Sequence, residues 1–523
     1  MTADNLPRVT YSNIGVDFTP LHDMLDRAIP EFKKGLGRAH PNRIAGKADE
    51  DGRAYDERGP ADGRLLIGRF VEASPAAVDR AVAAARAAFP AWSATPWQER
   101  VRVLRRAGDI LARRKYDLGI ACLLEVGKSR IEAMGEAEES LDLIAYYCDE
   151  MEANNGFARD MRRAFPQEAT SVVLRPIGAF GVIAPFNFPA ALSTGMMTGA
   201  LLGGNTVVYK PAPQASLVGT ILVDALIEAG LPAGAVNLVC GEESGRHLVD
   251  HPGLDGVAFT GSHEVGMQIL RKFANRPYAR PVIAEMGGKN PTYVSAKADL
   301  DLAAEGVMRS AFGLSGQKCS ACSVAYVERA VHDEFLDLLR QKTERLTIGN
   351  PEPREIYMGP VIDEEAGRRF DEAVARARRD GRIVHGGTRL SGGVFDHGTY
   401  VAPTIVAGLP NGHSLLRDEL FLPFLAVAPC DSLAAGIAEG NKIVYGLTAG
   451  VYTRDARELD LFFAQAEAGV LYANRRSGAT TGAWPGIQTF CGWKGSGVTN
   501  KGGLGPFYVP QFMREQSRTV MEA

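Results

Sequence analysis

The sequence predicts an α/β fold made of two Rossmann-like domains, each built on a parallel sheet. The chain has 523 residues, too many for one typical core, so two or three domains are expected. After residue 170, short apolar strands alternate with helices, as they do in parallel βαβ units. The alternation begins again after Asn290. Two such layers predict an active site where the domains face each other.

The part of the chain before residue 170 predicts an arm followed by helices. Residues 1–60 are polar and punctuated by glycine and proline, and only about residues 21–35 suggest a short helix. From Ser74 and Pro75 onward, apolar side chains recur at helical spacing. Two further helices are predicted at about residues 97–115 and 116–125.

The two α/β layers are predicted element by element. In the first layer we expect strands, each leading into a helix, at residues 178–183, 206–209, 236–239 and 257–259. In the second layer we expect a strand, a helix and a strand at residues 292–295, 302–311 and 323–327. The glycine-rich stretch 492–505 predicts a loop, because aromatic residues and Pro506 follow it at once.

Composition narrows the class of protein. Hydrophobic residues make up 46% and charged residues 23%, which is typical of a large soluble core. The net charge of -4 supplies no basic field and argues against nucleic acid as a partner. Seven scattered cysteines suit a reducing compartment. No targeting pattern or membrane-length apolar run is found, so we expect a cytoplasmic protein that does not bind membranes.

Two segments predict covalent chemistry. Cys319 lies among small residues in the segment 316–322, where a substrate carbonyl can approach it closely. Glu285 stands beside a glycine pair and is a candidate general base for that nucleophile. Each signal is weak alone, because a lone cysteine is more often a buried apolar residue and a lone glutamate is usually solvated.

A turn after the strand at 257–259 predicts a dinucleotide site. Gly261 and Ser262 follow the strand, and Gly266 lies in the amphipathic helix that comes next. A helix N-terminus in this position favours a pyrophosphate. The spacing is G-x-x-x-x-G rather than G-x-G-x-x-G, so an ordinary strand-turn-helix remains the alternative. Lys210 ends another strand, from which its ammonium can meet ribose hydroxyls or a 2′-phosphate.

Six motifs occur in an order and spacing that resemble the aldehyde dehydrogenase superfamily, from about residue 60 to about residue 515. They are the segments 184–189, 208–211, 259–262, 285–288, 316–322 and 419–421. Within the superfamily the chain is most similar to the L-glutamate γ-semialdehyde (1-pyrroline-5-carboxylate) dehydrogenases. That closer likeness rests on Gly127-Lys128, on residues 481–483 and on residues 494–503.

The resemblance implies a mechanism and a reaction. Cys319 would be the nucleophile, Glu285 the general base, and the Asn187 amide with the Cys319 N–H would stabilise the oxyanion. The implied reaction is oxidation of L-glutamate γ-semialdehyde to L-glutamate, through a thiohemiacetal and a thioester, in proline catabolism. An aldehyde dehydrogenase for another amino-acid semialdehyde is the alternative. Two weaker alternatives are an esterase and a binding protein that keeps the fold without catalysis.

The resemblance also implies how cofactor and substrate are held. Lys210, Gly261, Ser262, Gly266, Glu419, Phe421 and Pro185 are assigned to NAD. NADP remains open, because Pro213 replaces the acid that commonly chelates the ribose hydroxyls. The substrate carboxylate is assigned to Ser320, Gly482 and Ala483, and its aliphatic part to Phe490. Cys491 and the long segment 475–480 depart from the family pattern and keep another semialdehyde open.

We therefore expect the domain division of this family. It comprises an arm (1–60), a cofactor-binding domain (61–160 and 177–287), a catalytic domain (288–475) and a small β flap for homo-oligomers (161–176 and 490–523). Cys319 and Cys322 form a C-x-x-C pair that suggests a redox pair or half a zinc site. No second pair completes a zinc site, so no metal is predicted. His247 and His251 are interpreted as a helix end.

Overall fold

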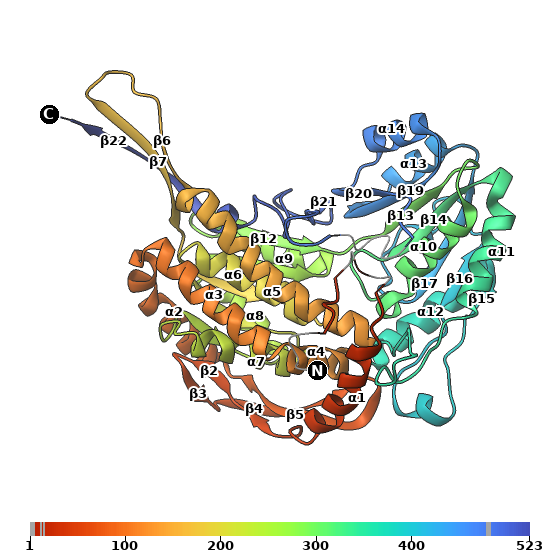
Figure 1. Ribbon diagram of the computed structural model, residues 1–523, viewed down its shortest axis with the longest axis horizontal. Helices are drawn as coiled ribbons and strands as arrows, with labels where there is room; N and C mark the ends of the chain where they lie inside the picture. Colours follow the sequence, from red (N-terminus) through yellow and green to blue (C-terminus); the bar gives the residue numbers. More distant parts are fainter. Residues whose placement is uncertain (1–5, 11–12, 14–15, 477–482, 523) are drawn as a thin grey trace.

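The computed structural model describes residues 6–10, 13, 16–476 and 483–522 of the chain. Figure 1 shows two bodies that face each other, each a sheet covered by helices, and a narrow flap that projects from one of them. The helix that precedes the sheets, α1 (Thr19–Lys33), lies where a short helix was predicted.

The first sheet has seven strands and is parallel over its central part. Its order is β12-β11-β8-β9-β10-β2-β3. The strands are β12 (Val282–Met286), β11 (Gly256–Gly261), β8 (Ala179–Ile183), β9 (Thr206–Lys210), β10 (Val236–Leu238), β2 (Asn42–Ile44) and β3 (Lys47–Asp49). The first five run parallel, and β2 and β3 add antiparallel at one edge. The alternating pattern after residue 170 is confirmed.

Helices cover this sheet, and all but α5, which was not predicted, lie where the sequence predicts a helix. They are α2 (Pro75–Ala94), α3 (Trp97–Arg113), α4 (Lys115–Val126), α5 (Arg130–Ala153), α6 (Pro189–Leu202), α7 (Ser216–Glu228), α8 (Glu243–Asp250) and α9 (His263–Ala274). Ser74 begins α2 as expected, since its side chain accepts a hydrogen bond from the Ala77 N–H at 3.0 Å. The helix-start signal in the sequence therefore marks the structural boundary.

The region predicted as an arm differs from expectation. Residues 39–59 form the short strands β1 (Ala39–His40), β2 and β3, and the longer β4 (Gly52–Gly59). β1 and β4 pair with β5 (Asp62–Ala73) in a three-stranded sheet, while β2 joins the first large sheet. Most side chains of β4 are exposed, so its residues lack the apolar alternation by which a strand is recognised.

The second large sheet lies in the other body and has the order β15-β16-β17-β14-β13-β19-β20. Its strands are β15 (Arg382–His385), β16 (Thr404–Ala407), β17 (Phe424–Cys430), β14 (Cys322–Glu328), β13 (Asn290–Val294), β19 (Thr448–Tyr452) and β20 (Val470–Ala473). Only the edge strand β15 is antiparallel to its neighbour. Its helices are α10 (Leu300–Phe312), α11 (His332–Thr343), α12 (Glu364–Asp380), α13 (Leu433–Asn441) and α14 (Ala456–Gln465).

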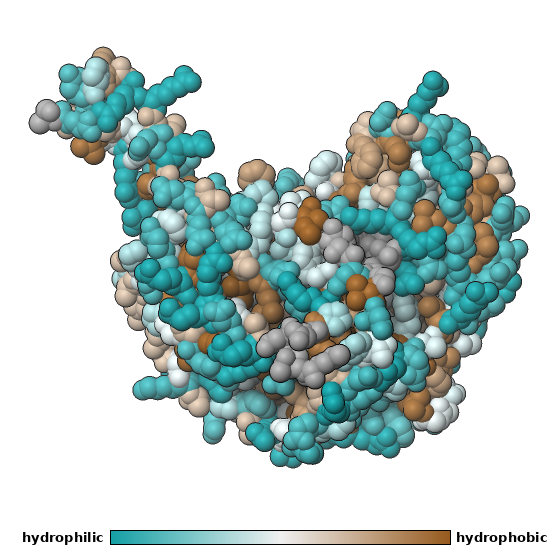
Figure 2. All heavy atoms as spheres, viewed as in Figure 1, coloured by the Kyte–Doolittle hydropathy of each residue, from teal (hydrophilic) through white to brown (hydrophobic). Residues whose placement is uncertain are grey.

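The flap is a three-stranded antiparallel sheet. It consists of β6 (Ala158–Asp160), β7 (Glu168–Pro176) and β22 (Met513–Met521), so it joins the middle of the chain to its C-terminal part. It carries exposed apolar side chains, among them Phe165 at 65% and Met521 at 67%. Figure 2 shows the surface hollowed between the flap and the body of the second sheet.

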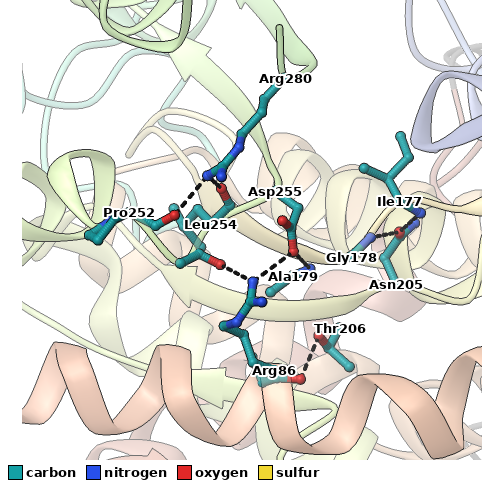
Figure 3. Close-up of polar contacts among 12 residues, drawn as sticks. Arg86, Ile177, Gly178, Ala179, Asn205, Thr206, Pro252, Leu254, Asp255 and Arg280 are labelled. Carbon is teal, nitrogen blue, oxygen red and sulfur yellow. Dashed lines mark hydrogen bonds and ion pairs between the residues drawn. The ribbon is translucent and has the colours of Figure 1, made fainter. Parts of the chain in front are cut away.

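Polar side chains fix the amino ends of the first sheet's strands (Figure 3). The Asp255 carboxylate accepts the Ala179 N–H at 3.0 Å and pairs with Arg86 at 3.2 Å. Asn205 accepts two further N–H groups, from Ile177 and Gly178. With the amino ends held in this way, the opposite ends of β8, β9, β11 and β12 meet along the edge that faces the second sheet. No helix in the described part of the chain is long and apolar enough to span a membrane.

Candidate active site

A cavity of about 270 Å³ brings together residues that the sequence predicts as a site; we call it the central cavity. Its walls include Cys319, Glu285, Ser320, Ala483 and Phe490. The remaining wall is largely apolar and includes Leu143, Tyr147, Phe188, Met196, Leu504 and Tyr508. An apolar cavity with a few polar groups is typical of a site for a small molecule.

The loop that carries Cys319 is wound tightly between α10 and β14. Leu314, Ser315 and Gly316 all have positive φ, and a Cβ on Gly316 would lie 2.2 Å from the Leu422 carbonyl oxygen. The fully buried carboxamide of Gln317 accepts the Ile362 N–H at 2.9 Å. The thiol is therefore presented by a loop with a fixed backbone rather than by a flexible surface turn.

Asn290 clamps this loop, and sequence reasoning missed it. Its Nδ2 donates to the carbonyl oxygens of Cys319 and Ala321, at 2.7 and 2.9 Å, and its Oδ1 accepts the Thr448 N–H at 3.0 Å. A Cβ on Gly288 would lie 2.7 Å from the Cys319 carbonyl oxygen, so glycine is needed for this close approach. The only signal in the sequence is that Asn290 follows the predicted glycine pair at a short distance.

Burial keeps the Cys319 thiol neutral. Burial, together with the negative charges of Glu419 and Glu285, raises the pKa of Cys319 to about 12. Backbone N–H groups of Ser320 and Cys319 act in the opposite direction. A base must therefore remove the proton before or during attack on a substrate.

Glu285 lies in β12 and faces the same cavity. Its Oε2 is buried and has no hydrogen-bond partner in the described part of the chain. Burial raises the pKa of Glu285 well above its usual value, and the Gly492 N–H partly offsets this by donating to the carboxylate. A carboxyl group with a raised pKa that faces a thiol is suited to accept and return protons near neutral pH.

Asn187 lies beside the cavity rather than on its lining surface. It sits in the loop between β8 and α6, 2% exposed, and the next residue, Phe188, forms part of the wall. Glu136 holds this loop, because its Oε1 accepts the first N–H groups of α6 from Ala190 and Ala191 at 2.7 and 3.2 Å. Its Oε2 lies 2.6 Å from Lys128 Nζ. Lys128 in turn lies over the Phe188 ring at 3.6 Å.

Glu419 and Phe421 lie at the boundary of the two bodies. Glu419 Oε1 accepts the Gly288 N–H at 2.9 Å, and a Cβ on Gly287 would collide with the Glu419 carboxylate at 1.9 Å. Burial raises the pKa of Glu419 to about 7. The rings of Phe421 and Phe186 meet edge to face at 5.9 Å. The glycine pair thus admits the Glu419 carboxylate on one side and the Cys319 loop on the other.

The other predicted cofactor residues lie at the carboxyl ends of the first sheet's strands. Lys210 ends β9, is 8% exposed and forms no ion pair within the described ranges, and burial lowers its pKa to about 8. Ser262 caps α9 by accepting the Val265 N–H at 3.3 Å, directly after Gly261 ends β11. Gly266 packs α9 against β12, since a Cβ there would lie 2.4 Å from Met286 Sδ. Pro185 lies between β8 and Asn187.

These groups fit a dinucleotide. The buried Lys210 ammonium, which forms no ion pair within the described ranges, suits ribose hydroxyls, and the Glu419 carboxyl, with its raised pKa, suits a second ribose. The start of α9 supplies N–H groups for a pyrophosphate. Lys210, Gly261, Ser262 and Glu419 do not line the central cavity.

The predicted substrate anchor is only partly described. Ser320, Ala483 and Phe490 line the central cavity, whereas Gly482 lies outside the described residues. Glu139 of α5 also lines the cavity and was missed. Burial, together with the charge of Glu136, raises the pKa of Glu139 to about 8. The helical spacing of Glu132, Glu136 and Glu139 was the available signal, because such residues share one face.

The C-x-x-C pair and the two histidines can be placed in the fold. All seven cysteines, Cys319 and Cys322 included, carry free thiols. Within the described ranges no group of three or more His, Cys, Asp or Glu side chains is arranged to hold a metal. His247 lies in the last turn of α8 and His251 caps it, 3.3 Å from Asp79, so the interpretation as a helix end is confirmed.

Comparison with known proteins agrees with this geometry. The model of the aldehyde dehydrogenase family matches residues 47–517. A 1-pyrroline-5-carboxylate dehydrogenase of Bacillus mycoides is 36% identical over 504 residues, which are 95% of each chain. The crystal structure of 1-pyrroline-5-carboxylate dehydrogenase from Thermus with bound NAD superposes with a TM-score of 0.92 at 32% identity and covers all of both chains. Proline utilization A from Bdellovibrio bacteriovorus superposes with a TM-score of 0.90 at 33% identity, over 95% of this chain and 52% of that one.

Proposed function

The chain belongs to the aldehyde dehydrogenase family, and on that premise we propose that it oxidises L-glutamate γ-semialdehyde to L-glutamate, with NAD as hydride acceptor, in proline catabolism. One observation carries the proposal. Cys319, Glu285 and the candidate carboxylate anchor Ser320 line a single cavity. The name and NAD content of the similar Thermus structure support the choice of substrate and cofactor.

The reaction begins when Cys319 attacks the aldehyde carbon and loses its proton to Glu285. The carbonyl oxygen becomes an alkoxide, for which the Asn187 amide and the Cys319 N–H are the proposed donors, and each such donor is typically worth about 10²–10³ in rate. Bound NAD supplies the acceptor for the hydride that leaves this centre, and a thioester remains on Cys319. Glu285 releases the thiol proton to solvent and then takes a proton from water, which attacks the thioester. The carboxylic acid is released as Glu285 returns its proton to the leaving Cys319 sulfur.

The polar groups of the cavity suit an amino-acid aldehyde. Ser320 is 4% exposed and the Ala483 backbone lies nearby on the wall, so a hydroxyl and N–H groups can bind an α-carboxylate. Glu139 also lines this cavity, and its side chain is the proposed partner of the α-ammonium group. Phe490 would cover the aliphatic part of the substrate between these groups and Cys319.

We assign the cofactor to Lys210, Gly261, Ser262, Glu419, Phe421 and Pro185, with Gly266 as the glycine that packs α9 on the sheet. We also propose that residues 61–160 and 177–287 form the cofactor-binding domain and 288–475 the catalytic domain. The exposed apolar flap would assemble homo-oligomers, because an isolated projecting sheet is otherwise an aggregation hazard. A cytoplasmic location fits the seven free thiols.

The test is a panel of aldehydes assayed for NADH and NADPH formation. L-glutamate γ-semialdehyde, α-aminoadipate semialdehyde, succinate semialdehyde and propanal differ in length and in the presence of an amino group. We expect the highest kcat/KM for L-glutamate γ-semialdehyde and a preference for NAD. A higher kcat/KM for another amino-acid semialdehyde would identify that aldehyde as the substrate and leave the proposed mechanism unchanged.

Ser320→Ala should raise KM for L-glutamate γ-semialdehyde by about tenfold and leave KM for propanal nearly unchanged, because a hydrogen bond to a charged group contributes about 1.5–3 kcal/mol. Steady-state kinetics with both aldehydes check this. The matched control is Ser323→Ala, three residues further along, which does not line the central cavity. Equal increases for both aldehydes would remove Ser320 from the carboxylate anchor.

A further inference from the structure

We propose that residues 6–10, here called the N-terminal strap, form one wall of the aldehyde cavity, and that Val9 and Thr10 limit the size of the aldehyde. Both residues line the central cavity together with Cys319, although they belong to the N-terminal arm and lie far from Cys319 in the sequence. Val9 is 6% exposed, so its side chain is packed and not solvated. In Figure 1 the dark-red chain before α1 runs between α5 and the body of the second sheet.

Arg8 fastens the strap to α5. Its Nε donates to Glu138 Oε2 at 2.8 Å and its Nη2 donates to Asp142 Oδ1 at 2.7 Å. The Glu138 side chain is only 4% exposed and also binds Lys115 Nζ at 2.9 Å. Two carboxylates from successive turns of one helix thus hold a single guanidinium, which sets the strap's position along α5.

The same helix connects the strap to the opposite wall. Asp142 Oδ2 accepts the Trp484 Nε1–H at 2.8 Å, and Trp484 lines the central cavity beside the candidate anchor residue Ala483. Gly135 of α5 lies next to the strap, since a Cβ there would be in ordinary contact with Val9 Cγ1 at 3.5 Å. Strap and anchor loop are therefore positioned by one carboxylate, and a shift of either would change the shape of the cavity.

On its other side the strap borders a second cavity of about 380 Å³. The two cavities share Val9, Thr10, Ile131, Glu132 and Lys318, so these side chains form the partition between them. The ion pair between Lys318 Nζ and Glu132 Oε1, at 2.8 Å, forms part of this partition. Without the strap the central cavity would open into this larger space, and aldehydes too bulky for it would reach Cys319.

The inference uses the proposed function only to place the reaction at Cys319. It is tested with the full-length enzyme, by comparing kcat/KM for L-glutamate γ-semialdehyde with that for 3-phenylpropanal. Arg8→Ala and Val9→Gly should shift the ratio about tenfold toward 3-phenylpropanal, a difference typical of a small change in an apolar pocket. Val9→Phe should shift the ratio the other way, because it fills the wall. The shift should appear in KM more than in kcat, since the strap does not contact the reacting atoms.

Arg105→Ala is the matched control, because this arginine also binds two acidic side chains of α5, Asp149 and Glu152, but does not line the central cavity. Its ratio should equal that of the wild type. Unchanged ratios in Arg8→Ala, Val9→Gly and Val9→Phe would overturn the proposal, as would equal losses for both aldehydes accompanied by a lower Tm. A shifted ratio in an enzyme that prefers some other aldehyde would uphold the strap and reject the proposed substrate.

Discussion

Cys319→Ala is expected to abolish aldehyde oxidation, with kcat reduced by at least about 10³-fold, because no covalent intermediate can form without the thiol. NAD affinity should stay within about twofold of the wild type, a difference below 0.5 kcal/mol. The groups assigned to NAD, such as Lys210 and Glu419, do not line the central cavity and keep their positions. NADH formation measures the first effect, and calorimetric titration of NAD measures the second.

Cys322→Ala is the matched control for this variant. Cys322 is also a free thiol, but it is buried, begins β14 and does not line the central cavity. Its turnover should remain within a few fold of the wild type. Retained turnover in Cys319→Ala, or its loss in Cys322→Ala without a loss of stability, would mean that the nucleophile has been wrongly assigned.

Glu285→Gln is expected to slow both chemical steps, because Glu285 is the proposed base for the Cys319 thiol and for water. Steady-state turnover should fall by about 10²–10⁴, the usual contribution of a general base. No burst of NADH should precede the steady state, since the attack of Cys319 is slowed together with the hydrolysis. Glu334→Gln, at an exposed position of α11, serves as the control and should turn over normally.

The pH dependence provides a separate check on Glu285. Because burial raises the pKa of Glu285 well above its usual value, its basic form increases with pH over a higher range than that of an ordinary glutamate. In the wild type, hydrolysis of the thioester should therefore accelerate as the pH rises through the pKa of Glu285. The slope should disappear in Glu285→Gln, where no carboxylate titrates. An identical pH profile in both proteins would assign the base to another group.

Much of the fold could be predicted from the sequence because local patterns encode it. The strands of the first sheet follow apolar runs, and Ser74 and Ser262 mark the helix starts where they cap α2 and α9. The strands at residues 39–59 were not predicted, since their mostly exposed side chains carry no apolar alternation. Their place in a sheet depends on partners such as β5 and β10.

The candidate site, too, was predicted from the sequence only in part. Cys319, Glu285 and Ser320 were predicted from motifs, and the structure gathers them around one cavity, while their roles stay predictions. Asn290 and Glu136 were not predicted. Asn290 holds the backbone of Cys319 and Glu136 holds the start of α6, and the local signals, a nearby glycine pair and a helical spacing of glutamates, do not indicate these partners.

The sequence by itself determined the alternation of strands and helices, the family resemblance and the chemistry-bearing residue types. Short-range spacing and side-chain chemistry are enough to specify these. Only the tertiary structure decided which distant segments complete the cavity: Arg8 reaches α5, and Asp142 binds Trp484 across 342 positions of the chain. Such contacts depend on how the bodies pack against each other, and packing is settled by complementarity over the whole core, which no local pattern records.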